Sequence, residues 1–183
     1  IDFAGDAIMC WFDGSHGPAE SRAMCCALAF QQVMQSFKTI QLPGGMEAAL
    51  AVKVAVATGP ARRFVVGDPE VNYIDALAGA TVARTSAGES LAHKGDVLAD
   101  EATVEALGPA LLIAEWRIFS GSGSETRFAV ITSFQGESTP PVQTELTDLP
   151  PASDSKAWLH DIVYEREQSG QDLMTEFRPC AAL

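Results

Sequence analysis

The sequence predicts an α/β protein of the α+β sandwich type, in which a mostly antiparallel sheet is flanked by helices. Two kinds of periodicity support this fold class. Short apolar runs bounded by turn-forming residues are typical of strands, and apolar residues spaced three and four apart are typical of helices. A third observation indicates antiparallel pairing, because a Gly/Ser loop at 121–124 joins the apolar runs 111–119 and 128–131 as a hairpin does.

Composition excludes several classes of protein. The 183 residues include 24 acidic and 12 basic ones, and the net charge of -12 argues against nucleic-acid binding through a basic surface. Hydrophobic residues make up 47% of the chain, enough for a packed core, yet no window approaches the roughly 18–20 apolar residues of a membrane span. The first ten residues lack the basic region of a signal peptide, so we expect a cytoplasmic protein.

The first predicted element is a hairpin over residues 1–12. An apolar run from Phe3 reaches Gly5 and Asp6 and resumes through Phe12, and the glycine supplies the backbone freedom that a tight turn needs. Asp6 is then expected at the tip of an otherwise apolar hairpin. Its carboxylate has three open interpretations: it stays solvated, it pairs with a cation, or it binds a metal ion.

A helix and a strand follow the hairpin. A helix is predicted over 21–37 from apolar residues at helical spacing. Its expected buried face consists of Ala23, Cys26, Ala27, Phe30, Val33, Met34 and Phe37. After a Pro/Gly break, the run 50–57 is predicted to be a largely buried strand that pairs with residues 61–66 through a turn at Gly59 and Pro60.

The next elements alternate between helix and strand. A helix is predicted over 81–91 in spite of Gly88. A short strand over 97–99 and a short helix over 101–107 come next, and the helix is expected to end at the following Gly-Pro pair. The hairpin described above then completes the domain.

The composition changes after residue 132. Proline recurs among Ser, Thr, Glu and Asp over 133–155, which is typical of a linker. Residues 156–176 are predicted to form a connecting helix, with Trp158, Ile162 and Val163 on the face that packs against the domain. The predicted divisions are therefore 1–132, 133–155, 156–176 and 177–183.

The cysteines show no metal-binding pattern. They are Cys10, Cys25, Cys26 and Cys180, none at the spacing of a zinc site, and the three histidines are scattered. Cys25 and Cys26 are adjacent in a predicted helix and cannot easily pair with each other, whereas Cys10 belongs to an apolar run. We therefore expect reduced, buried thiols, as is usual inside cells.

Several stretches follow one another in an order that points to a known family. They are Phe3-Ala4-Gly5-Asp6, Ala57-Thr58-Gly59, Phe64-Val65-Val66-Gly67-Asp68, Ile74-Asp75-Ala76-Leu77-Ala78-Gly79 and Gly95-Asp96-Val97-Leu98-Ala99-Asp100-Glu101-Ala102. Together they resemble the class III adenylate/guanylate cyclase catalytic domain, and more closely the first cyclase-homology domain of soluble, tandem-domain adenylyl cyclases. The resemblance implies a ferredoxin-like nucleotide cyclase fold over 1–132 that lacks its first strand and helices, and a second cyclase-homology domain that starts at 177–183.

The same resemblance implies a function. The chain is expected to be the metal-binding half of a tandem pair that converts ATP to cyclic AMP and pyrophosphate in intracellular signalling. Asp6 corresponds to a metal-binding aspartate of the family, and the resemblance implies a two-metal site for Mg²⁺ or Mn²⁺ whose other ligand lies on a preceding strand, outside the fragment. A nucleoside triphosphate and the second domain of the same chain are the implied partners. A solvated turn carboxylate remains the alternative for Asp6.

Asp2 is the other candidate site residue. By the same resemblance it occupies a position where many family members carry a purine-contacting lysine, which makes it a candidate substrate-binding residue. An acidic residue reverses that charge, so we favour the simpler interpretation, a solvated acid at the end of a strand.

The helix after Gly79 lacks two groups that the resemblance leads one to expect. Alignment on this glycine places Ala83 and Ala87 where the family has the Asn and Arg that stabilise the transition state, and Arg84 lies on another face of the helix. No catalytic residue beyond the metal ligand is then expected in the fragment, which should be inactive alone. The alternative is a catalytically degenerate cyclase-homology module that senses a ligand or pairs domains.

Overall fold

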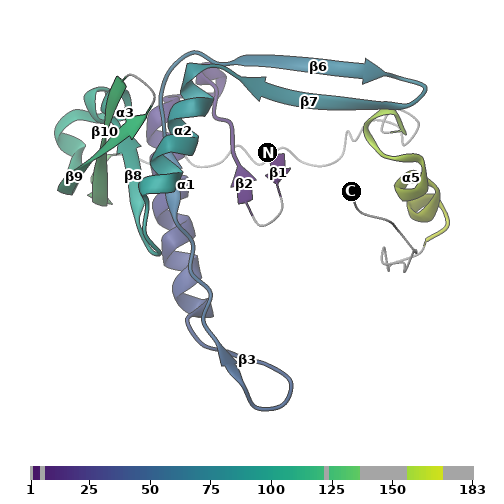
Figure 1. The fold of residues 1–183 in the computed structure, drawn as a ribbon, viewed down its shortest axis with the longest axis horizontal. Coiled ribbons are helices and arrows are strands. Elements are labelled where there is room, and N and C mark those ends of the chain that lie inside the picture. Colours follow the sequence, from purple (N-terminus) through teal and green to yellow (C-terminus); the bar gives the residue numbers. More distant parts are fainter. Residues whose placement is uncertain (1, 5–6, 122–123, 137–155, 171–183) are drawn as a thin grey trace. The chain divides into compact units, whose positions relative to one another are not determined.

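The chain divides into two compact units in the computed structural model, which describes residues 2–4, 7–121, 124–136 and 156–170. One unit comprises Ile1–Ala61 and Ala78–Val142, and the other comprises Arg62–Leu77 and Gln143–Leu183. Figure 1 shows the helices and strands of both. Among the described residues, no helix combines the length and the apolar character needed to cross a membrane.

The first unit is built around a four-stranded sheet with the order β5-β8-β10-β9. Its strands are β5 (Val54–Val56), β8 (Val97–Asp100), β9 (Leu111–Gly121) and β10 (Ser124–Phe134). Strand β10 pairs antiparallel with both β8 and β9, whereas β5 pairs parallel with β8. The structure therefore confirms the predicted antiparallel-dominated sheet and the hairpin that ends the domain.

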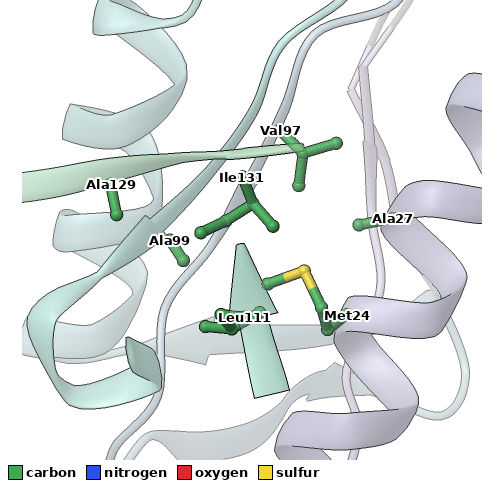
Figure 2. Packing of buried hydrophobic residues seen from close by; sticks show 7 residues of the cluster. All are labelled: Met24, Ala27, Val97, Ala99, Leu111, Ala129 and Ile131. Atoms are coloured by element: carbon green, nitrogen blue, oxygen red, sulfur yellow. The ribbon is translucent and has the colours of Figure 1, made fainter. Parts of the chain in front are cut away.

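Helices cover both faces of this sheet. They are α1 (Ala19–Met34), α2 (Ala80–Leu91) and α3 (Glu101–Leu107). On one face, buried residues of α1 pack with the sheet, joined by partly buried residues of α3; Figure 2 shows Met24, Ala27, Val97, Ala99, Leu111, Ala129 and Ile131. On the other face, Leu98, Phe128 and Val130 pack against α2 and the residue after it. The alternation of side chains along β8 and β10 thus supplies both halves of the core.

The buried face of α1 differs from the predicted one. Met24 and Ala27 are buried, Leu28 is partly buried, and the Gln31 side-chain amide donates 3.0 Å hydrogen bonds to two loop carbonyls. These four positions have the i, i+3, i+4, i+7 spacing of one helix face. The prediction that the face includes Phe30, Val33 and Phe37 is wrong, since these side chains are 40%, 59% and 42% exposed. The rotation of the helix lets Gln31 add a second hydrogen bond to the carbonyls of Val52 and Asp96, which also accept from the backbone N–H groups of Gly95 and Val54.

The predicted pairing of residues 50–57 with 61–66 is also wrong. Within residues 50–57 the strand is limited to β5 (Val54–Val56), which pairs with β8 in the register Val54↔Val97. Two parallel strands need a long crossover connection, and the connection from β5 to β8 contains α2. The Gly59–Pro60 segment does not turn back on β5, because the Thr81 hydroxyl of α2 donates to the Pro60 carbonyl at 2.8 Å.

Gly88 lies within α2, as predicted, and close packing explains why a glycine is present. A Cβ at this position would lie 2.8 Å from Cε1 of Phe128 and 3.1 Å from Cβ of Ala55. Both distances are shorter than ordinary van der Waals contact. The missing side chain therefore allows α2 to approach the sheet.

The remaining elements of the first unit are short. Two hairpins are formed by β1 (Asp2–Ala4) with β2 (Ala7–Met9) and by β3 (Ile40–Gln41) with β4 (Glu47–Ala48), both antiparallel. The described part of the unit also contains three single-turn 3₁₀ helices: η1 (Gly14–His16), η2 (Gln35–Phe37) and η3 (Gly108–Ala110).

The second unit contains a β-hairpin and a helical segment. The hairpin is formed by β6 (Arg62–Asp68) and β7 (Asn72–Ala78), and the helical segment by η5 (Lys156–Trp158) and α5 (Asp161–Gln168). The rings of Tyr73 and Trp158 lie 5.3 Å apart at 53°.

The predicted face of the connecting helix is only partly covered. Ile162 and Val163 are half-buried, but Trp158 is 44% exposed. The predicted linker lies outside the described residues from 137 onwards, and so does the predicted start of a second domain at 177–183.

Candidate functional site

The candidate metal ligand belongs to the hairpin of β1 and β2. These strands pair antiparallel, with Asp2 opposite Met9 and Ala4 opposite Ala7, which confirms the predicted hairpin. The two residues that join the strands, Asp6 among them, lie outside the described residues. The role of Asp6 as a metal ligand therefore stays a prediction.

Asp2 lies on the first strand of the same hairpin. Its backbone pairs with that of Met9, the last residue of β2. The structure does not describe the Asp2 side chain. Both interpretations of Asp2, substrate contact and solvated acid, remain open.

The segment that leaves this hairpin is attached to α1. The Arg22 guanidinium donates from Nη1 to the carbonyl of Asp13 at 2.9 Å, and its Cζ lies 5.6 Å from the centroid of the Phe12 ring. The Asp13 carboxylate accepts from the backbone N–H of Ser15 at 2.9 Å and caps η1. Hydrogen bonds from the Ser15 hydroxyl and backbone hold the pKa of Asp13 below its ordinary value. The exit of the hairpin thus has a fixed connection to the helix.

Helix α2 carries the two positions at which the family resemblance implies transition-state residues. Ala83 is exposed, whereas Ala87 is partly buried against the cluster that contains Leu98 and Phe128. Neither methyl group can donate a hydrogen bond to a phosphate oxygen. This helix therefore provides no charge stabilisation at these positions.

Arg84, the basic residue beside these positions, has a structural role. Its Nε donates to Oδ2 of Asp100 at 2.9 Å, and its Nη2 donates to the carbonyl of Thr58 at 2.7 Å. The Arg84 side chain is 30% exposed and that of Asp100 is 1% exposed. The guanidinium therefore connects α2 to the segment after β5 and to the end of β8, as expected for a residue on a different helix face from Ala83 and Ala87.

Asp100 is the residue of this region that the sequence analysis did not single out. Its Oδ1 accepts from the backbone N–H of Thr103 at 2.9 Å, from the Thr103 hydroxyl at 2.6 Å and from the N–H of Thr58 at 3.2 Å. The carboxylate caps α3 and also binds Arg84. The pattern of an Asp directly before a short helix was the available signal for the cap. Nothing in the sequence identified Arg84 as the counter-ion.

A second charged cluster attaches the far end of α2. Arg117 on β9 donates from Nη1 to Asp96 Oδ2 at 2.7 Å and to the Leu91 carbonyl at 3.0 Å, and its Nη2 lies 2.7 Å from Glu115 Oε1. Partial burial alone would raise the pKa of Asp96, but hydrogen bonds from Arg117 and from the His93 backbone outweigh it, so this pKa lies below the ordinary value. Hydrogen bonds to Asp96 and Glu115 raise the pKa of Arg117.

The described residues do not themselves form a metal site. Within 2–4, 7–121, 124–136 and 156–170, no three His, Cys, Asp or Glu side chains are grouped so that they could hold a metal ion. The buried carboxylate of Asp100 is already bound to an arginine and to backbone N–H groups. The assignment of Asp6 as a metal ligand therefore stays a prediction, because Asp6 lies outside these residues.

Comparisons with known proteins identify the fold. No family model matches the sequence, and no curated protein matches it either. Among solved structures, the guanylyl cyclase Cya2 is similar over 72% of this chain and 66% of its own, with a TM-score of 0.57 and 19% sequence identity. The guanylate cyclase domain of RhGC from Catenaria anguillulae, in complex with GTP, is similar over 67% of this chain and 65% of its own, with a TM-score of 0.48 and 16% identity.

The similarity to Cya2 shows that this chain has the fold of a class III cyclase-homology domain, as the sequence predicted. The chain spans slightly less than two thirds of the Cya2 chain. At this sequence identity the similarity concerns the fold, and function rests on particular residues.

Proposed function

We propose that this chain is the metal-binding half of a two-domain nucleotide cyclase that acts in intracellular signalling in the cytoplasm. The observation that carries the proposal is the cyclase-homology fold, shared with Cya2, together with the hairpin whose connecting residues include Asp6. The proposed substrate is a nucleoside triphosphate, and the sequence resemblance favours conversion of ATP to cyclic AMP and pyrophosphate.

The proposed contribution of this chain to the chemistry is a carboxylate ligand. In cyclisation the ribose 3′-oxygen attacks the α-phosphate and pyrophosphate leaves. Mg²⁺ or Mn²⁺ would supply neutralisation of the phosphate charge and activation of the attacking oxygen. Asp6 is the residue of this chain that we assign to the metal ions. The net charge of -12 makes such neutralisation important, because an acidic surface repels a triphosphate.

A second cyclase-homology domain is the proposed partner. Ala83 and Ala87 cannot stabilise negative charge, and Arg84 is bound to Asp100. Two copies of this chain would therefore both lack the transition-state residues. A tandem domain that contributes an Asn and an Arg would complete the site.

The test is cyclic nucleotide production by the full-length protein with Mg²⁺ or Mn²⁺ and with ATP or GTP. Asp6→Ala should lower turnover at least about 100-fold, by analogy with the loss of other electrostatic transition-state contacts. The matched control is Asp68→Ala, because Asp68 is also a turn carboxylate and accepts from the Glu70 N–H at 2.9 Å. Unchanged turnover in Asp6→Ala would assign Asp6 to the turn alone.

The absence of polar side chains at Ala83 and Ala87 also favours a second candidate function. A catalytically degenerate cyclase-homology module would bind a ligand or a partner domain without turnover. A full-length protein that binds ATP or GTP but forms no cyclic product, with or without Mn²⁺, would support this candidate against the enzyme. Under the enzyme proposal the purified 183 residues should form no product by themselves, because the transition-state Asn and Arg would come from the partner domain.

A further inference from the structure

Cys10 and Cys26 are less buried than the reduced, buried thiols that the sequence predicts. Cys10 follows the last residue of β2 and is exposed. Cys26 lies in α1 and is half-buried. Both are free thiols, so the arrangement of the segment around Cys10 against α1 decides whether they can react with each other.

The contacts of Arg22 fix that arrangement. Arg22 binds the carbonyl of Asp13 and lies over the ring of Phe12, so the segment that leaves β2 lies against α1 at this level. In Figure 1 this segment runs from β2 to the start of α1, and α1 then runs back in the opposite direction. From the contact with Arg22, the segment and the helix therefore run in opposite directions.

Cys10 and Cys26 lie at similar distances from the Arg22–Phe12 contact, measured along the segment and along the helix. Cys10 precedes Phe12 by two residues, which corresponds to at most about 7 Å along the chain. Cys26 follows Arg22 by four residues, which corresponds to about 6 Å along the same helix face. Because the segment and the helix run in opposite directions, Cys10 and Cys26 both lie on the same side of the Arg22–Phe12 contact.

Electrostatics agree with this placement. Burial raises the pKa of the Cys26 thiol, and the charges of Cys10 and Cys25 raise it further. Cys25 is the sequence neighbour, so its influence is expected. An influence of Cys10, sixteen positions away in the sequence, requires proximity in space, since the interaction between charges falls with distance.

We propose that Cys10 and Cys26 form a redox-responsive thiol pair that closes to an intrachain disulfide. The oxidant is a low-molecular-weight disulfide of the glutathione type. The exposed Cys10 thiolate attacks one sulfur of the oxidant, which forms a mixed disulfide and releases one thiolate. The Cys26 thiolate then attacks the Cys10 sulfur, displaces the second small thiolate and leaves the protein disulfide; the two protons lost by the cysteines end on the two released thiols.

The disulfide would join the exit of the β1–β2 hairpin to the middle of α1. It would add a covalent link between segments that the contacts of Arg22 already join. Disulfides in proteins inside cells are usually transient and redox-sensing, which is the behaviour expected of a pair with one exposed thiol. This inference does not depend on cyclase activity.

The test is oxidation of the native 183-residue chain with glutathione disulfide, followed by alkylation of the remaining thiols and peptide mass mapping. We expect the loss of two hydrogen atoms from the intact mass and a peptide that links Cys10 to Cys26. Cys25→Ser is the matched control and should give the same link, whereas Cys10→Ser and Cys26→Ser should each abolish it.

Two outcomes would overturn the proposal. One is a stable glutathione adduct on Cys10 with Cys26 still open to alkylation, which would show that the two sulfurs do not meet. The other is a link that involves Cys25 or Cys180 in place of Cys26. Because the mapping is performed on the unmutated chain, neither outcome depends on whether a variant folds.

Discussion

Arg84 and Asp100 form a 2.9 Å ion pair in which the carboxylate is 1% exposed. The pair connects α2 with the residue that ends β8 and caps α3. Because the same guanidinium also binds the Thr58 carbonyl, one side chain attaches α2 to the end of β8 and to the segment that follows the adjacent strand β5. The basic residue next to Ala83 is thereby committed to the scaffold.

Arg84→Ala should lower the free energy of unfolding by about 3 kcal/mol, because it leaves the Asp100 carboxylate buried without its counter-ion. The matched control is Lys53→Ala, whose 2.7 Å pair with Glu89 joins two side chains that are 39% and 51% exposed. A surface pair of this kind contributes at most about 1 kcal/mol. Urea unfolding followed by circular dichroism measures both, and equal losses would contradict the buried-pair argument.

Gly88→Ala should destabilise the protein by roughly 1–3 kcal/mol, although alanine is the better helix former. The new methyl group would lie 2.8 Å from the Phe128 ring and would push α2 away from the sheet. Ser86→Ala on the exposed face of α2 is the control and should be neutral or slightly stabilising. Thermal unfolding measures the change in stability of both variants. A gain in stability for Gly88→Ala would show that the helix has room to move.

The Asp96–Arg117 pair should make stability depend on acidic pH. The pKa of Asp96 is lower in the folded protein than its ordinary value of 3.8, so the folded state binds fewer protons than the unfolded state in the interval below 3.8. The stabilisation is therefore present above pH 3.8 and is lost as the pH falls through the folded pKa. Asp96→Asn and Arg117→Gln should both flatten this part of the curve of urea midpoint against pH. A curve of unchanged slope in both variants would contradict this assignment.

Trp158→Ala should release α5 from the β6–β7 hairpin. The Tyr73–Trp158 ring contact at 5.3 Å is of the kind that contributes about 0.5–1.5 kcal/mol beyond burial of its area. Amide hydrogen exchange in α5 should therefore become faster by up to about tenfold. Trp11→Ala is the control, since Trp11 is equally exposed and belongs to the other unit. Unchanged exchange in α5 would show that Trp158 does not hold the helix.

Local patterns predicted the elements that depend on near neighbours. The hairpin at the N-terminus, the helix that contains Gly88 and the short helix after Asp100 all appear where spacing and turn residues placed them. The fold itself was predicted from the order of motifs, and the similarity to Cya2 confirms it. These successes share a cause, because each signal lies within a few residues of the structure it determines.

Features decided by distant contacts were missed. The parallel pairing of β5 with β8 joins positions about forty residues apart, and no pattern near Val54 distinguishes it from a hairpin. The rotation of α1 brings the Gln31 amide to the carbonyls of Val52 and Asp96, which are distant in the sequence. At the site, the sequence located the hairpin of Asp6 and the alanines of α2, but it did not show that Arg84 is held by Asp100.

The parallel pairing of β5 also has a consequence for the order in which the chain folds. Only two residues separate β9 from β10 in the sequence, so the contacts between these strands form at small entropic cost. Within the described part of the chain, β5 lies at the edge of the sheet and pairs only with β8, and this pairing requires closure of the long crossover that contains α2. Non-local contacts of this kind form slowly. We therefore expect β5 to join the sheet after the other three strands, so that this edge is the last to become protected during refolding.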